Sequence, residues 1–292
     1  MEKKVWGLNS FWLKVIGCFL MTMDHIALLF VSSDPLGSSY TLYYVLRAVG
    51  KMAFPIFAFL AVEGVYHTHD IKKYLLRLGV LAILLDAFGF IIGAVTNMSV
   101  ASNPLIGNVF TDLFLGVLTV YLISKRKWYS FAAVLPIVYA FFTRYYLNDT
   151  WGFLFKADWG AFSIVLFVLF ALAHEGVTCF LKSRAIQDAL EPDAYLLVDG
   201  LKYWKIFASL CLVSTVAIFY LIYRLSNFSV LLPNEFVPIG TYTALAFVFI
   251  LLYNGQKGYS KKAIRYAFYA YYPFHIVLLG IISLYFGVLA TL

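Results

Sequence analysis

Apolar blocks of about 20 residues recur along the whole of this 292-residue sequence. A helix of that length crosses the hydrocarbon core of a bilayer, so each block is a candidate transmembrane span. A sequence that is 63% hydrophobic and 13% charged also lies outside the usual composition of soluble domains. We therefore predict an all-α, polytopic transmembrane helix bundle that forms a single domain over residues 1–292. The predicted spans, about nine and at most ten, lie near residues 12–32, 40–66, 71–95, 105–124, 128–147, 161–182, 203–225, 236–253 and 261–290.

Basic residues concentrate in alternate loops between these spans. The loops on the same side as the N-terminus hold Lys72, Lys73, Arg77, Lys125, Arg126, Lys127, Lys182, Arg184, Lys202, Lys205, Lys257, Lys261, Lys262 and Arg265. The loops on the other side hold Arg144, Lys156 and Arg224. Because basic loops remain in the cytoplasm, we expect a cytoplasmic N-terminus and a C-terminus outside. The stretch near 183–202 is expected to form a cytoplasmic linker or surface helix.

The net charge of +7 has two possible explanations, a nucleic acid partner or the membrane itself. The basic residues lie in short loops next to apolar spans, where they contact anionic headgroups. Membrane lipids are therefore the expected partner, and no nucleic acid is expected. The three cysteines, Cys18, Cys179 and Cys211, have neither disulfide pairing nor metal-ligand spacing, so no metal site is expected.

The first predicted span carries Asp24 and His25 side by side near the middle of the membrane. Other ionisable residues within predicted spans are Arg47, Lys51, Asp86, Asp112 and His275. A charged group at the centre of a membrane helix costs about 2.5–3.5 kcal/mol, so such groups face one another or water. The set predicts a polar cavity inside the bundle, although any one member could instead belong to a structural ion pair.

Lys14 and His25 are eleven residues apart, which is close to three helical turns. Their side chains therefore point the same way, about 16 Å apart along the helix axis. This arrangement suits a ligand with an anionic head and a long arm, such as coenzyme A, whose phosphates would contact Lys14 together with Lys72 or Lys73. The alternative is that Lys14 is an ordinary interfacial lysine of a cytoplasmic helix end.

Coenzyme A carries acyl groups as thioesters, so such a ligand would indicate acyl transfer. Acyl transfer from a thioester needs a base that takes the proton of the acceptor and a hydrogen-bond donor that stabilises the developing oxyanion. His25 is the expected base because imidazole titrates near neutral pH. We expect direct transfer, since no nucleophilic cysteine or serine lies near the pair, although an acetyl intermediate on His25 is the alternative.

The other polar residues receive supporting roles. Adjacent helix residues point about 100° apart, so we expect Asp24 to bind Arg47 or Lys51 on another helix rather than His25. Arg47 and Lys51 share one helix face and could instead meet a phosphate or the acetyl carbonyl. Supporting roles in holding the acceptor or the oxyanion are expected for His275 and Tyr272, although His275 could be a packed residue. Glu63 and His67, four residues apart, are expected to pair at the cytoplasmic mouth.

Four stretches resemble the signatures of the TraX family. They are Met21-Thr22-Met23-Asp24-His25-Ile26, the segment Leu46 to Gly64 that continues through His67-Thr68 to Leu78, and the pair Tyr253-Asn254-Gly255-Gln256-Lys257-Gly258 and Tyr272-Pro273-Phe274-His275. The family is known for membrane-embedded acetylation of the N-terminal amine of pilin. It also resembles a broader group of transmembrane acyltransferases, including heparan-alpha-glucosaminide N-acetyltransferase, in which a basic residue precedes a first-helix histidine by the spacing of Lys14 and His25. The resemblance implies acetyl-CoA as the acyl donor and the bacterial cytoplasmic membrane as the location.

Some positions depart from the family pattern, and they bear on the acceptor. Lys51 stands where arginine is usual, Asp86 replaces a glutamate, and Asp158-Trp159-Gly160 replaces an Asp-Tyr-Gly. The acceptor could be a pilin-like protein N-terminus, or a lipid-linked or glycan amine or hydroxyl in the cell envelope. O-acetylation of an envelope glycan, a proton- or cation-coupled transporter and a non-catalytic assembly protein remain as alternatives.

Overall fold

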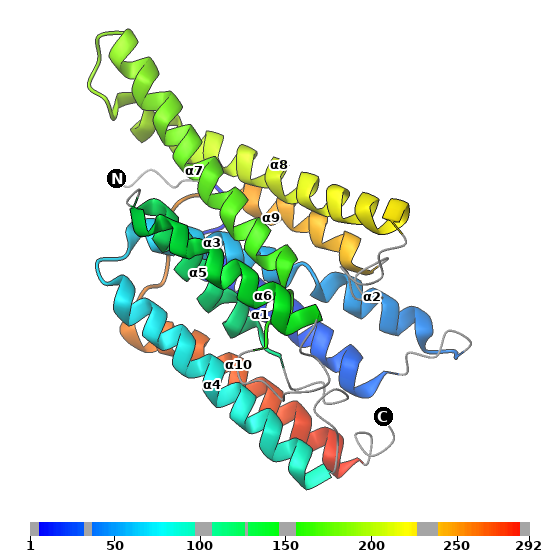
Figure 1. Cartoon of the computed structure of the whole chain (residues 1–292). Helices are drawn as coiled ribbons and strands as arrows, with labels where there is room; N and C mark the ends of the chain where they lie inside the picture. The colour runs from blue at the N-terminus through cyan, green and yellow to red at the C-terminus, as the bar shows by residue number, and fades with distance from the viewer. Residues whose placement is uncertain are drawn as a thin grey trace.

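The computed structural model describes residues 6–31, 37–96, 107–125, 128–145, 156–226 and 239–286, and these residues form helices joined by turns. The α-helices are α1 (Ser10–Phe30), α2 (Tyr40–Gly50), α3 (Ala53–His67), α4 (Ile71–Thr96), α5 (Val109–Ser124), α6 (Val134–Tyr145), α7 (Ala161–Gln187), α8 (Ala194–Ser226), α9 (Phe247–Leu252) and α10 (Lys262–Tyr285). Two 3-10 helices, η1 (Trp128–Ala133) and η2 (Ile239–Ala246), precede α6 and α9. Figure 1 shows these helices gathered into one bundle.

Six helices of the described residues are long and apolar enough to cross a membrane. They are Ser10–Phe30, Tyr40–His67, Ile71–Val95, Ala161–Gln187, Ala194–Leu225 and Lys262–Ser283. The other three predicted spans correspond to shorter apolar helices, Val109–Ser124, Ser130–Thr143 and Ile239–Leu252. The 16 residues of α5 rise only about 24 Å, less than the hydrocarbon thickness of about 30 Å. The all-helical membrane bundle is therefore confirmed, while the number of complete spans stays a prediction.

The second predicted span is interrupted at Lys51 and Met52, where α2 ends and α3 begins. The N–H of Met52 donates to the carbonyl of Val49 at 3.2 Å, a tighter turn than that of an α-helix. Pro55 has no N–H, so the carbonyl of Lys51 lacks the donor that a continuous helix would provide. The interruption places Lys51 at a helix junction inside the bundle.

The stretch near 183–202, expected as a linker or surface helix, is instead mostly continuous with two long helices. α7 extends to Gln187 and α8 begins at Ala194, so only a short turn separates them. The turn is closed by a hydrogen bond from the N–H of Leu190 to the carbonyl of Ala185 at 2.8 Å. An ion pair between Lys182 and Asp193, at 2.9 Å, joins the two helices. Figure 1 shows this hairpin extending beyond the other helices at the upper left.

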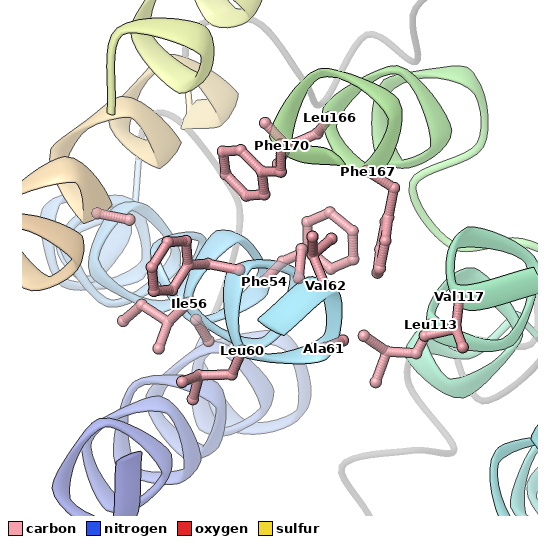
Figure 2. Packing of buried hydrophobic residues seen from close by; sticks show 14 of the residues in the cluster. Phe54, Ile56, Leu60, Ala61, Val62, Leu113, Val117, Leu166, Phe167 and Phe170 are labelled. Atoms are coloured by element: carbon pink, nitrogen blue, oxygen red, sulfur yellow. The ribbon is translucent and has the colours of Figure 1, made fainter. Parts of the chain in front are cut away.

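The centre of the bundle is α3, which contacts α1, α5 and α7. Figure 2 shows Phe54, Ile56 and Val62 of α3 packed among residues of α5 and α7. Phe59, which is fully buried, stacks on Trp204 of α8 with ring centroids 4.4 Å apart. Burial of side chains of this size contributes about 1.5–3 kcal/mol each. The packing fixes α3, and with it the junction at Lys51, relative to α1 and α7.

The segment before α1 pairs with the segment after α9. The N–H of Leu8 donates to the carbonyl of Leu252 at 2.8 Å, and the N–H of Asn254 donates to the carbonyl of Leu8 at 2.9 Å. Asn9 caps α1 by accepting the N–H of Trp12 at 3.1 Å. Gly258, at φ +66°, approaches Asn9 so closely that a Cβ atom would collide with it. These contacts bring the first turn of α1 and the segment leading into α10 to the same end of the bundle.

Candidate functional site

Two imidazoles from opposite ends of the sequence meet inside the bundle. Nδ1 of His25 on α1 lies 3.0 Å from Nε2 of His275 on α10, although 250 residues separate them. Nδ1 of His275 lies 3.0 Å from the main-chain carbonyl oxygen of Tyr271, one helical turn earlier. His275 is buried, and its ring also stacks on that of Tyr271 with centroids 5.1 Å apart. The sequence identified both histidines but not their contact.

The partners of His275 determine which nitrogen of each ring carries hydrogen. A carbonyl oxygen only accepts hydrogen bonds, so Nδ1 of His275 is the donor to Tyr271. In the neutral ring, Nε2 of His275 is then an acceptor, and the hydrogen between the rings belongs to Nδ1 of His25. Nε2 of neutral His25 consequently carries a free lone pair. This tautomer is the one that a general base requires.

Asp24 pairs with two cations from the α2–α3 region. One of its carboxylate oxygens, Oδ2, lies 2.7 Å from Nη1 of Arg47 and 3.6 Å from Nζ of Lys51. Arg47 is buried, so this ion pair is shielded from water. The prediction that Asp24 binds a residue on another helix rather than His25 is confirmed. Nη1 of Arg47 binds Asp24, and contact of Arg47 with a phosphate or the acetyl carbonyl stays a prediction.

A close approach of α1 and α2 makes this pairing possible. Gly50 lies against the main chain of Asp24, and a Cβ atom at residue 50 would collide with it. Because the two helices touch at a glycine, Arg47, one turn before Gly50, reaches Asp24 directly. The glycine thus serves as the spacer that sets the distance between the two helices.

A small pocket adjoins the ion pair and the imidazole. Its polar lining comes from Asp24, His25, Lys51, Asp158, Trp159 and Tyr272. The ring of Tyr272 lies edge-on to His25, with centroids 6.0 Å apart. Lys51 contributes its ammonium, which lies 5.1 Å above the ring of Trp159. The predicted residues His25, Asp24, Lys51 and Tyr272 therefore converge on one cavity.

Asp158 and Trp159, in the segment Asp158–Gly160, line the pocket. Asp112 holds this segment in place. Asp112 is fully buried on α5 and accepts the N–H of Asp158 at 2.7 Å and the N–H of Trp159 at 3.2 Å. The ring of Trp159 stacks on Phe54 at 4.8 Å between centroids, with an interplanar angle of 15°. Gly160 has φ +56°, a conformation that favours glycine. Asp112 therefore holds the main chain of Asp158 and Trp159, and its predicted role in supporting the substrate stays a prediction.

Asp86 lies outside the pocket lining. It is fully buried on α4, and its Oδ1 accepts from Nδ2 of Asn108 at 2.8 Å. Asn108 also caps α5, because its Oδ1 accepts the N–H groups of Phe110 and Thr111 at 3.0 and 3.2 Å. Asp86 therefore fixes the start of α5, which carries Asp112, and its support of the site is indirect.

The residues predicted at the cytoplasmic mouth are arranged differently from expectation. The side chains of Glu63 and His67 do not pair directly: Nδ1 of His67 hydrogen bonds to the main-chain carbonyl of Glu63 at 3.0 Å. The Glu63 carboxylate instead accepts from the hydroxyl of Tyr253 at 2.6 Å, because the segment after α9 passes this end of α3. Lys14 lies near this carboxylate, with its ammonium 5.9 Å above the ring of Phe268.

Lys72 and Lys73 are exposed at the start of α4, in the same end of the bundle. Asp70 caps that helix by accepting the N–H of Lys73 at 3.0 Å, and the Lys73 ammonium lies 2.9 Å from Asp70. These hydrogen bonds, the one from the main chain first, hold the pKa of the Asp70 carboxyl below its usual 3.8. Lys73 is thus partly neutralised by Asp70. Phosphate binding by Lys14, Lys72 and Lys73 stays a prediction.

Sequence reasoning gave Asp158 and Trp159 no role beyond a departure from a motif. Their position in the pocket depends on where α7 begins relative to α3 and α5, and no local pattern carries that information. The available signal was the Asp-Trp-Gly tripeptide directly before a long apolar helix. Within the described ranges, no group of three or more His, Cys, Asp or Glu residues is placed to hold a metal ion.

The fold and the site define a class: a polytopic helical membrane protein with a histidine pair and a buried ion pair beside an internal pocket. Residues 10–283 match the family model described as TraX protein. The chain belongs to the TraX family. It is also 28% identical over 274 residues to a probable fimbrial assembly protein FimC, serogroup H1, from Dichelobacter nodosus, across 93% of this chain and 94% of that protein. No solved structure matches the chain.

Proposed function

We propose that this protein is a membrane acetyltransferase that moves an acetyl group from cytosolic acetyl-CoA to an amine of the cell envelope. The observation that carries the proposal is the His25–His275 hydrogen bond, since it leaves Nε2 of His25 as a free base beside the pocket. The family and the fimbrial relative favour a pilin-like protein N-terminus as the acceptor.

In this mechanism acetyl-CoA is a substrate that supplies an activated acetyl thioester. The acceptor nitrogen, as a neutral amine, attacks the thioester carbonyl carbon; the C–N bond forms and the C–S bond breaks. Nε2 of His25 takes the proton from the attacking nitrogen and returns it to the departing thiolate. The products are the acetamide and free CoA thiol, so atoms and charge balance. Direct transfer needs no acyl-enzyme intermediate.

The neighbouring residues have separate tasks. His275 is a positioning residue, because it accepts the Nδ1 hydrogen of His25 and holds the reactive tautomer. Asp24 neutralises Arg47 and moderates the charge of Lys51. Lys51 and Tyr272 line the pocket. The Lys51 ammonium and the Tyr272 hydroxyl are hydrogen-bond donors that would stabilise the oxyanion as it develops on the acetyl carbonyl.

Donor and acceptor would approach from opposite ends of the bundle. Lys14 lies on the same stripe of α1 as His25, toward the end that carries Lys72 and Arg265. We assign this basic end to the cytoplasm by the positive-inside rule, so the CoA phosphates would bind there. The pocket wall at Asp158 lies at the start of α7, whose other end belongs to the basic side.

The test is release of free CoA thiol from acetyl-CoA by purified protein supplied with a peptide that has a free N-terminus. Wild type should release CoA and yield acetylated peptide, and His25→Asn should lower the rate by about 10²-fold or more. His69→Gln is the matched control, because His69 is exposed in the turn before α4. Equal rates for wild type and His25→Asn would refute His25 as the base.

A further inference from the structure

Asp158 is the carboxylate of the pocket that the mechanism above does not use. Among the described residues, its side-chain oxygens have no hydrogen-bond or ion-pair partner, whereas the Asp24 carboxylate has Arg47 and Lys51. Lys51 is the cation that shares the pocket, and it lies 3.6 Å from Asp24 and over the Trp159 ring. Asp158 is only partly buried and lines the pocket, so a cationic ligand that enters the pocket can reach its carboxylate.

Several contacts fix the position of Asp158. Two main-chain N–H groups, those of Asp158 and Trp159, are held by the buried Asp112 carboxylate. Stacking of Trp159 on Phe54 fixes the segment against α3, and the backbone turns at Gly160 directly into α7. A group held by this many contacts loses little conformational entropy when a ligand binds. More of its interaction energy therefore contributes to the binding affinity.

We propose that Asp158 is the residue that selects the acceptor, by binding the ammonium form of a primary amine next to His25. This inference rests on the proposed function and deepens it by naming the residue that selects an amine as the acceptor. A carboxylate only accepts hydrogen bonds, and an ammonium offers three donors together with the opposite charge. A neutral hydroxyl offers one donor and no charge, so the site discriminates against alcohols.

The location of Asp158 fits this role in two ways. It lines the same pocket as His25, so an amine bound to Asp158 would share that pocket with the base. It also lies at the start of α7, away from the basic end, so an acceptor from the envelope reaches it without passing the donor. The bound ammonium first releases one proton to water, and the neutral amine then follows the transfer step above.

The test compares two probes that differ only in the reacting group, alaninamide and lactamide. Their binding to purified wild type, Asp158→Asn, Asp158→Glu and the control Asp199→Asn is measured by isothermal titration calorimetry without acetyl-CoA. Wild type, Asp199→Asn and Asp158→Glu should bind the amine about tenfold or more tightly than the alcohol. Asp158→Asn should lose that preference. Asp199 lies on α8, outside the pocket, and Asp158→Glu keeps the charge if the neutral variant folds poorly.

Two results overturn the inference: equal binding of both probes by wild type, or an unchanged preference in folded Asp158→Asn. CoA release measured on the same samples separates this proposal from the proposed function. Release of CoA without any amine preference would overturn the role of Asp158 alone. A preference that depends on Asp158 without CoA release would support amine binding and overturn acetyl transfer.

Discussion

The reacting residues of the site are positioned by specific neighbours. His25 has its tautomer set by His275, Asp24 pairs through Oδ2 with Arg47, and the main chain of Asp158 is held by Asp112. In a medium with little water, a polar group left without such a partner costs more than it does at a protein surface. Substitution of such a partner should therefore change the position or the protonation of the residue that it contacts.

Replacement of His275 should separate a positioning role from simple packing. His275→Phe keeps an aromatic ring but removes the acceptor for His25, so we expect CoA release to fall by about 10²-fold. His275→Gln provides an amide oxygen that can accept the same hydrogen and should retain more activity than the phenylalanine variant. The rate of CoA release is measured as a function of pH. A change in the tautomer of His25 should shift this pH profile, whereas a loss of packing around His275 should not. Equal activity of the two variants would contradict the assignment.

The Asp24–Arg47 pair should show strong coupling. Asp24→Asn leaves the buried Arg47 without its closest counter-charge and should lower the free energy of unfolding by about 3–5 kcal/mol. The double variant Asp24→Asn with Arg47→Gln removes both charges, so it should be less destabilised than the sum of the single variants. Thermal unfolding in detergent measures all three. Additive losses would show that the pair does not interact.

The helices place these residues through close contacts at small side chains. α1 and α2 touch at Gly50, α5 meets the ring of Phe167 at Gly116, and the segment before α1 meets Gly258. Such contacts bring helix backbones near one another in membrane proteins, where the hydrophobic effect contributes little to association. Larger residues at these points would separate the helices that carry the site.

Gly50→Ala should therefore lower stability and activity together. The added methyl group collides with the backbone of Asp24, and overpacking of this kind costs about 1–3 kcal/mol. Gly176→Ala on α7 is the matched control, since a Cβ atom there has open space, and it should be neutral or slightly stabilising. Melting temperature and CoA release report both effects. A harmless Gly50→Ala would disprove the close approach of α1 and α2.

Several elements were predictable because membrane length and burial of charge are local constraints. The apolar runs located α1, α4 and α7, and the cost of a lone charge pointed from Asp24 to Arg47 and Lys51. The break between α2 and α3 was not predictable from hydropathy, which stays high from Tyr40 to His67. For the stretch 183–202 the sequence left a linker and a surface helix open, and the structure shows helix on both sides of a short turn that the Lys182–Asp193 ion pair spans.

Contacts between residues far apart in the sequence limited how much of the site could be predicted. His25 and His275 were both chosen from the sequence, but only the packing of α10 on α1 brings the rings together. The role of Asp112 became visible once the start of α7 was placed beside α5. For the same reason, the sequence did not reveal the distant partner of Glu63. His67 does contact Glu63, through its main-chain carbonyl, but the Glu63 carboxylate accepts from Tyr253, 190 residues away.

For the whole molecule, the proposed function requires two access routes to one histidine. The basic end with Lys14 and Arg265 would receive the donor from the cytoplasm, and the pocket at Asp158 would receive the acceptor from the other side. The membrane would then keep the acetyl-CoA pool apart from the envelope, and the protein would transfer only the acetyl group. This division is the central claim of the proposed function.

The most direct measurement uses proteoliposomes loaded with isotope-labelled acetyl-CoA, with a peptide that has a free N-terminus supplied only outside. Mass spectrometry of the external peptide then reports acetyl transfer across the bilayer. Wild-type vesicles should label the peptide at its amine, while vesicles with His25→Asn should label it about 10²-fold more slowly. No labelling by wild type, or equal labelling by both proteins, would contradict acetyl transfer through His25.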